Sequence, residues 1–216
     1  MTDQGASVSS RVPAFEKQLK LVKDGFKASI DKHKALGKAQ TGTLINNLTK
    51  AQKREPFAGL ETALGAVRDA LQNIERARES AITERMKSTI LDKIKDMDTN
   101  IKVPIKDLLD DMNKKLSTLK RQENKASPDE TAIADARKNH RDATAQFFNN
   151  VPGFEESRVA DTKVLLTEYC NSMMFYHCRA VEQLSAALAV IGQVESKKAE
   201  ALAEKAVKRE RDLGRR

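Results

Sequence analysis

The chain has little of what builds sheets, disulfide frameworks or membrane spans. Its 216 residues contain no Trp, two Cys, five Pro and nine Gly. So few helix breakers leave long stretches that favour helix over strand. No apolar run approaches the ~20 residues that cross a bilayer, and Met1 to Ser10 is too polar for a signal peptide. These absences predict an all-α, soluble, intracellular protein.

Catalytic and metal-binding patterns are also missing. Cys170 and Cys178 flank His177, but no further ligand follows at a spacing that zinc sites use, so both thiols are expected to be small buried hydrophobic groups. His33, His140 and His177 are scattered, and no glycine-rich phosphate-binding loop is present. We therefore predict that the chain is not an enzyme and has no metal and no cofactor.

What the sequence does contain is apolar residues three and four apart, the spacing of amphipathic helices. This spacing predicts one helix from Pro13 to Lys50, irregular near Gly37 and Gly42, and a turn at Arg54 to Pro56. A second helix follows from Phe57 to about residue 126 and a third from Pro128 to Val194. Residues 13–195 would form one helical domain, after a disordered segment 1–12 and before a basic tail, 196–216, that is partly helical or disordered.

The turn between the second and third helices, and one proline on each side of it, predict paired kinks. Ser127 is expected to cap the third helix, with Pro128 at its first position. Pro104 and Pro152 lie at similar distances from this turn, ~35 Å along each helix. Because proline removes one helical hydrogen bond, the two antiparallel helices should bend at the same level.

Apolar stripes of this length exceed what three helices of one chain can cover. A helix that is amphipathic over so many turns needs a partner along its whole length. The sequence therefore predicts a two-fold homodimer. Its central bundle is expected to contain Phe15, Leu19, Leu64, Tyr169, Tyr176 and Leu184.

The positive charge is concentrated in two segments. The net charge is +8, and residues 112–141 and 196–216 each carry eight basic and four acidic residues, so the rest of the chain is neutral in sum. The first segment, here called the tip, surrounds the turn between the second and third helices. A basic tip suits an anionic surface, although Lys/Glu mixtures on long helices are often only solvating. Nucleic-acid binding is not expected, because the basic segments lack interleaved aromatics and any recognisable module.

Three stretches resemble BAR domains: Val103 to Leu116 with its early proline, Phe147 to Glu156 with its Pro-Gly, and Glu168 to Leu184 with its Tyr-His pair. The resemblance covers roughly residues 13–195 and is nearest to BAR-only proteins of the ciliary BAR-like type or to sorting-nexin BAR domains. It implies three long kinked antiparallel helices that form a crescent-shaped coiled-coil homodimer. The implied function is to bind anionic membranes and to sense or generate their curvature.

The resemblance also implies which residues meet the lipid. The basic tip residues match membrane-binding positions of the family: Lys114, Lys115, Lys120, Arg121, Lys125, Arg137, Lys138 and Arg141. Lys95, Lys102 and Lys106 would be secondary positions, weakened by nearby aspartates. Expected partners are phosphoinositides or phosphatidylserine, with possible trafficking or cytoskeletal proteins, on the cytoplasmic side of membranes in processes such as endocytosis. The alternative is a structural coiled coil, such as a spectrin-like cytoskeletal adaptor that binds acidic proteins.

Overall fold

The computed structural model of the chain describes residues 8–213, and within that range it contains helices and short connections but no strand. The predicted all-α fold class is confirmed. Contacts divide the chain into two compact units. One contains the described residues up to Ser29 together with Met86–Cys170, and the other contains Ile30–Arg85 together with the described residues from Asn171 onward.

The first helical stretch consists of α1 (Val8–Ala39), the π-helical η1 (Gln40–Ile45) and α2 (Asn46–Arg54). α1 begins at Val8, inside the segment 1–12 that was predicted to be disordered, and residues 1–7 lie outside the described part. The irregularity expected at Gly42 is the π-helical segment itself. Two side chains bond to backbone carbonyls there, Thr41 Oγ1 to Gly37 at 2.8 Å and Asn46 Nδ2 to Gly42 at 3.1 Å, and such bonds compete with regular helix.

The second helical stretch also alternates between α and π windings. It contains α3 (Ala58–Arg78), η2 (Glu79–Arg85), η3 (Lys87–Leu91), α4 (Asp92–Met97), η4 (Asp98–Lys102) and α5 (Val103–Glu123). Buried side chains recur every four residues along it, and none is more than 4% exposed: Ile74, Arg78, Ile82, Met86, Ile90 and Ile94. In an α-helix residues four apart drift by roughly 40°, so five such steps would turn the row away from the core. The wider π turns at η2 and η3 reduce this drift.

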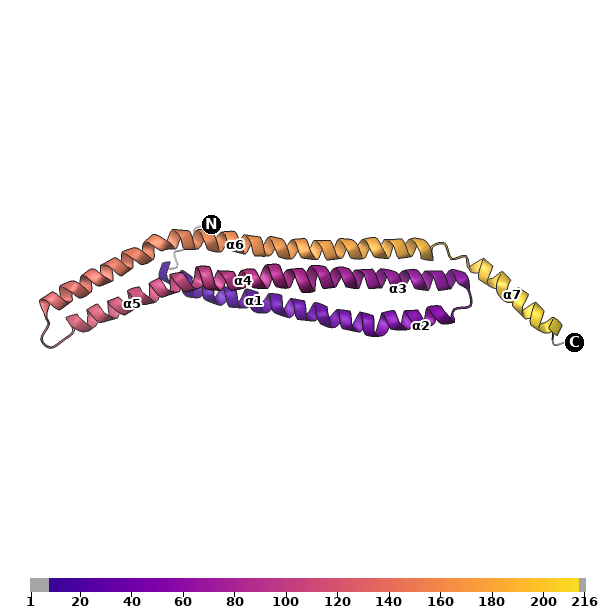
Figure 1. Cartoon of the computed structure of the whole chain (residues 1–216), viewed down its shortest axis with the longest axis horizontal. Helices are drawn as coiled ribbons and strands as arrows, with labels where there is room; N and C mark the ends of the chain where they lie inside the picture. Colours follow the sequence, from indigo (N-terminus) through magenta and orange to yellow (C-terminus); the bar gives the residue numbers. More distant parts are fainter. Residues whose placement is uncertain (1–7, 214–216) are drawn as a thin grey trace. The chain divides into compact units, whose positions relative to one another are not determined.

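Pro104 and the residue that follows Pro152 line a common pocket. Pro104 follows η4, where the Val103 N–H bonds to the Asp98 carbonyl five residues earlier. This wider turn precedes the proline, whose ring would otherwise crowd the carbonyl four residues back. Pro104 and Gly153, the residue after Pro152, line one pocket of about 270 Å³. Figure 1 shows α5 and the first part of α6 side by side, and the shared pocket places Pro104 and Gly153 at a similar level of this hairpin. A bend of both helices at this level stays a prediction.

The third helical stretch, α6 (Glu130–Ile191), starts two residues later than predicted. Its cap is Asp129, whose Oδ1 accepts from the Thr131 and Ala132 N–H groups at 2.9 and 3.2 Å. The expected cap at Ser127 is therefore wrong, because the carboxylate of Asp129 satisfies the free N–H groups of the first turn. A last helix, α7 (Ser196–Leu213), covers most of the segment that was predicted to be a partly helical or disordered tail.

Aromatic and ionic contacts join α1 to α6 in the unit that contains the tip. The Phe15 and Phe154 rings meet edge to face at 5.6 Å, and the Phe26 and Tyr169 rings lie 5.3 Å apart. Lys93 on α4 pairs with Asp161 on α6 at 2.9 Å. Edge-to-face pairs add to the free energy gained by burying the rings themselves. They fix α1 against α6 within this unit.

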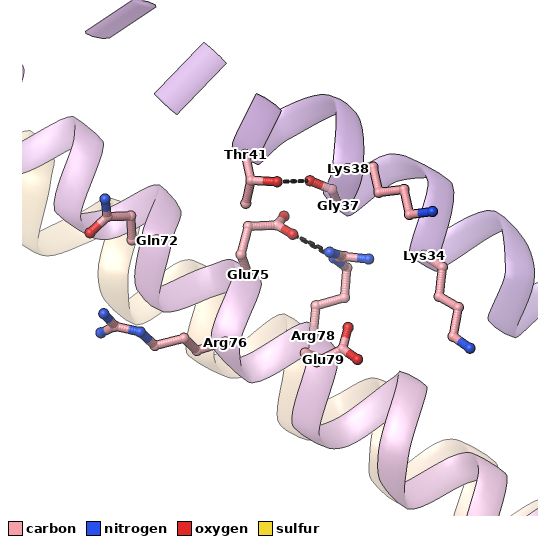
Figure 2. A pocket seen from close by; sticks show the side chains of 9 residues that line it. All are labelled: Lys34, Gly37, Lys38, Thr41, Gln72, Glu75, Arg76, Arg78 and Glu79. Atoms are coloured by element: carbon pink, nitrogen blue, oxygen red, sulfur yellow. Dashed lines mark hydrogen bonds and ion pairs between the residues drawn. The ribbon is translucent and has the colours of Figure 1, made fainter. Parts of the chain in front are cut away.

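The other unit buries an arginine against a glycine. Arg78 on α3 is 4% exposed and donates from Nε to Glu75 Oε2 at 3.0 Å, with a second bond from Nη2. Its guanidinium lies on Gly37 of α1, where a Cβ would overlap it. Figure 2 shows the Arg78 side chain extending from α3 toward Gly37. The glycine is thus required by close approach of a side chain, and α1 remains regular at this residue.

Replacing Gly37 with alanine tests this contact. Alanine favours helix over glycine by about 1 kcal/mol, but at Gly37 we expect a net loss of about 1–3 kcal/mol because the methyl group overlaps a buried guanidinium. Gly25→Ala is the matched control, since nothing lies within 4 Å of its Cβ position. It should raise the free energy of unfolding by about 0.5–1 kcal/mol. Equal stabilisation by both substitutions in chemical denaturation would contradict the contact.

The pKa of His33 predicts a pH dependence of stability. Its ring meets Tyr176 edge to face at 5.9 Å, and burial, then the charges of Arg78 and His177, lower the pKa of His33 below its ordinary value. As the pH falls through about 6.5, the unfolded state therefore takes up this proton first and stability decreases. His33→Gln should lose less stability than the wild type between neutral and mildly acidic pH. If the denaturation midpoints of the wild type and of His33→Gln changed with pH in the same way, His33 would not be the cause of the pH dependence.

Candidate functional site

The tip is a helical hairpin closed by a short loop and a narrow apolar seam. The Asn124 N–H bonds to the Lys120 carbonyl at 3.0 Å as α5 ends. Leu119, Ala136 and Ala143 are buried between α5 and α6. Figure 1 shows the two helices of this hairpin, α5 and the first part of α6. Most of its basic side chains are exposed to solvent.

Two of the eight predicted tip cations are engaged in ion pairs. Lys115 Nζ lies 3.0 Å from Asp111 Oδ2, and Arg137 Nη2 lies 3.0 Å from Glu123 Oε1. Such surface pairs contribute little stability, but they reduce the charge available to a ligand. The other six are exposed and make no ion pair within residues 8–213: Lys114, Lys120, Arg121, Lys125, Lys138 and Arg141.

The three predicted secondary positions behave differently from one another. Lys102 pairs with Asp98 and, at 3.8 Å, with Glu16 on α1. The hydrogen bond with Asp98 is the main reason why the pKa of Lys102 is raised. Lys106 Nζ also lies near Glu16 Oε1, at 3.3 Å. Lys95 alone is exposed, so the nearby carboxylates reduce the charge of this region more than the sequence suggested.

A second basic surface lies between α1 and α4–η4, and its lysines on α1 were not predicted. A pocket of about 540 Å³ is lined by basic side chains from both sides, among them Lys17, Lys20, Lys23 and Lys95. The three α1 lysines are spaced three apart in the sequence, which places them on neighbouring surfaces of one helix. That spacing was visible in the sequence. Their proximity to Lys95, more than seventy residues away, depends on tertiary packing.

The six predicted dimer-interface residues divide by burial. Phe15 and Leu19 are 4% and 6% exposed within one chain, so they have little surface left for a partner. Leu64, Tyr169 and Tyr176 are half-buried. Leu184 on α6 is 44% exposed. Their role in a dimer stays a prediction.

Leu184 belongs to an exposed apolar stripe on α6. Its members alternate at spacings of three and four, the pattern of a coiled-coil seam. The stripe, here called the α6 seam, consists of Met174, His177, Val181, Leu184, Leu188 and Ile191. Met174, Val181 and Leu188 are each 64–65% exposed. This amount of apolar surface on one face of a helix is typical of an interaction site.

The thiols were wrongly predicted to be buried. Cys170 and Cys178 are both free and exposed, because they lie on the outer side of α6 near the α6 seam. Along residues 8–213, no three or more His, Cys, Asp or Glu side chains gather as metal ligands would.

α7 is a basic helix that is largely exposed to solvent. All its residues from Glu200 to Arg211 are exposed, including Leu202 and Val207. Isolated helices of this length are marginal in water. The charge predicted for the tail is therefore displayed on a helix.

Comparison with known proteins identifies the fold. No family model and no curated protein matches the sequence. Among solved structures, the N-terminal I-BAR domain of D. discoideum IBARa matches with a TM-score of 0.52 and 13% sequence identity, over 94% of this chain and 99% of that chain. Over the part that the structure describes, no helix is long and apolar enough to span a bilayer. The chain has a BAR-like, all-helical fold.

Proposed function

We propose that the protein is a membrane-binding scaffold that docks on anionic lipid through its basic tip and senses or generates curvature as a homodimer. The observation that carries this proposal is the set of six exposed tip cations without ion pairs. Each basic residue near an anionic bilayer contributes about 1 kcal/mol. Two tips in a dimer would act together, since the second contact becomes intramolecular.

The dimer is supported by the α6 seam, whose spacing would suit a coiled-coil partner. A second copy of the chain is the simplest partner because it brings an identical seam. The proposed lipids are phosphoinositides or phosphatidylserine, recognised mainly by charge. The proposed site of action is the cytoplasmic face of membranes in endocytosis or trafficking, as in BAR-only, ciliary BAR-like or sorting-nexin BAR proteins.

Neutralising the unpaired tip cations should abolish vesicle binding. In the fourfold variant Lys114→Gln, Lys120→Gln, Arg121→Gln and Lys125→Gln, about 4 kcal/mol is lost per tip, which corresponds to roughly a thousandfold in affinity. Cosedimentation with phosphatidylserine vesicles at low salt measures this. The wild type should also dissociate as salt rises, because the Debye length falls from ~10 Å at 0.1 M to ~3 Å at 1 M.

The matched control removes four positive charges from α7. It carries Lys197→Gln, Lys198→Gln, Lys205→Gln and Lys208→Gln and should retain most of the binding. If this control loses binding and the tip variant keeps it, α7 is the lipid contact instead. A wild type that ignores acidic vesicles at low salt would refute the membrane function and favour an adaptor that binds acidic proteins.

A single charge on the α6 seam should disrupt the dimer without unfolding the chain. Val181 is 65% exposed in one chain, so Val181→Glu leaves the protomer unstrained but would bury an unpaired carboxylate in the dimer. We expect the dimer to weaken by a few kcal/mol, roughly a hundredfold or more in its dissociation constant. Ala186→Glu, exposed on another side of α6, should have little effect. Sedimentation equilibrium that finds Val181→Glu as dimeric as the wild type would exclude the seam as the interface.

A further inference from the structure

A basic pocket distinct from the tip lies between the end of α1 and α3. Its volume is about 490 Å³, within the range of small-molecule sites. Four cationic side chains line it, Lys34 and Lys38 from α1 with Arg76 and Arg78 from α3, together with Glu75 and Glu79. Figure 2 shows Glu75 and Arg78 extending from α3 toward α1, while Arg76 points away from Lys34 and Lys38. The lining has a net charge of +2.

Arg78 is the buried part of this site, and its hydrogen bonds are only partly satisfied. Its Nε and Nη2 both donate to Glu75 Oε2, while Nη1 is buried without a partner. A buried guanidinium nitrogen left unpaired costs free energy. The buried Nη1 donor therefore has unused hydrogen-bonding capacity at the base of the pocket, as does the buried acceptor Glu75 Oε1.

The two α1 lysines are also available. Lys34 and Lys38 are one helical turn apart, exposed, and without an ion pair among residues 8–213. Arg76 donates to Asn73 at 3.0 Å but makes no ion pair in that range either. The exposed cations Lys34, Lys38 and Arg76 lie at the rim of the pocket, and the buried guanidinium of Arg78 lies at its base. Together these hydrogen-bond donors suit a tetrahedral oxyanion better than a single carboxylate.

We propose that this pocket binds a phosphomonoester carried by a small polyol. The net charge of +2 matches a phosphate dianion, and the Gln72 amide at the wall offers a donor and an acceptor for a hydroxyl group. Inositol phosphates have this chemistry, either free in solution or as the headgroup of a phosphoinositide. The site goes beyond the proposed function, since it uses none of the tip residues and can fill without a membrane.

Two paired variants test the pocket. Lys34→Gln with Lys38→Gln removes two exposed cations that line it, and Lys50→Gln with Lys53→Gln removes two exposed cations of α2 that do not. Calorimetric titration of the full chain with inositol trisphosphate should show binding that the first variant weakens roughly tenfold or more. The second variant should bind as the wild type does. Inorganic phosphate should compete with the trisphosphate in the wild type.

A second experiment, with vesicles, distinguishes a lipid headgroup from a soluble phosphate as the ligand. Phosphatidylcholine vesicles are compared with and without phosphatidylinositol bisphosphate, in the absence of phosphatidylserine. If the Lys34/Lys38 variant loses both the free trisphosphate and the phosphoinositide vesicles, the pocket takes a lipid headgroup. If it loses only the free compound, the ligand is a soluble phosphate.

Two results would overturn the proposal. One is a wild type that shows no heat of binding with inositol trisphosphate at low salt. The other is an equal loss of affinity for inositol trisphosphate in both lysine variants, which would mean that binding depends only on the net charge of the protein. Neither result depends on whether the tip binds phosphatidylserine, so failure of this pocket and failure of the membrane function are distinguishable.

Discussion

Burial of the second helical stretch, residues 58–123, is the constraint on which the other helices depend. Its apolar side chains recur every four residues from Ile74 to Ile94, with Arg78 as the one charged member. An α-helix cannot keep such a row on one side for long. In the π-helical segments the backbone hydrogen bonds are poorer than in an α-helix, but the wider turns keep this row of side chains buried. Ile82, Met86 and Ile90 are completely inaccessible to solvent as a result.

The same burial determines how the charges are used. Arg78 can occupy a core position because Glu75 lies one turn earlier and Gly37 leaves room for the guanidinium. At the tip the seam is narrow, so the cations remain in solvent and pair only where a carboxylate lies on the next turn or on the facing helix. Exposed cations keep their long-range attraction for anions. The structure thus contains one buried, partly neutralised arginine and, at the tip, several exposed lysines and arginines without ion pairs among the described residues.

α6 has apolar residues on two of its sides. Phe154, Leu165 and Ala187 face the chain's own core and are buried. The α6 seam, offset around the same helix, remains in water. A helix with apolar residues on two sides carries more hydrophobic surface than one chain covers, and this excess is the physical basis for expecting a partner.

The sequence by itself determined the all-α class, the two short turns near residues 55 and 126, and the similar level of Pro104 and Gly153, because helical spacing and breakers are local properties. It also located the charge of the tip, since counting residues requires no coordinates. It failed at the cap of α6, where Asp129 and Ser127 are both acceptable residues and only the path of the loop selects between them. Nor could it distinguish the buried from the exposed apolar side of α6, so Cys170 and Cys178 were misplaced.

Only the tertiary structure decided which cations are free. Lys114 and Lys115 are neighbours in the sequence and each follows an aspartate by four residues, yet only Lys115 is paired, with Asp111. Glu16 neutralises Lys106 from ninety residues away. The pocket of Lys34, Lys38, Arg76 and Arg78 likewise joins two helices whose charges look unremarkable when each is read alone. Charge pairing between distant segments depends on distances of a few ångströms, which a one-dimensional pattern does not contain.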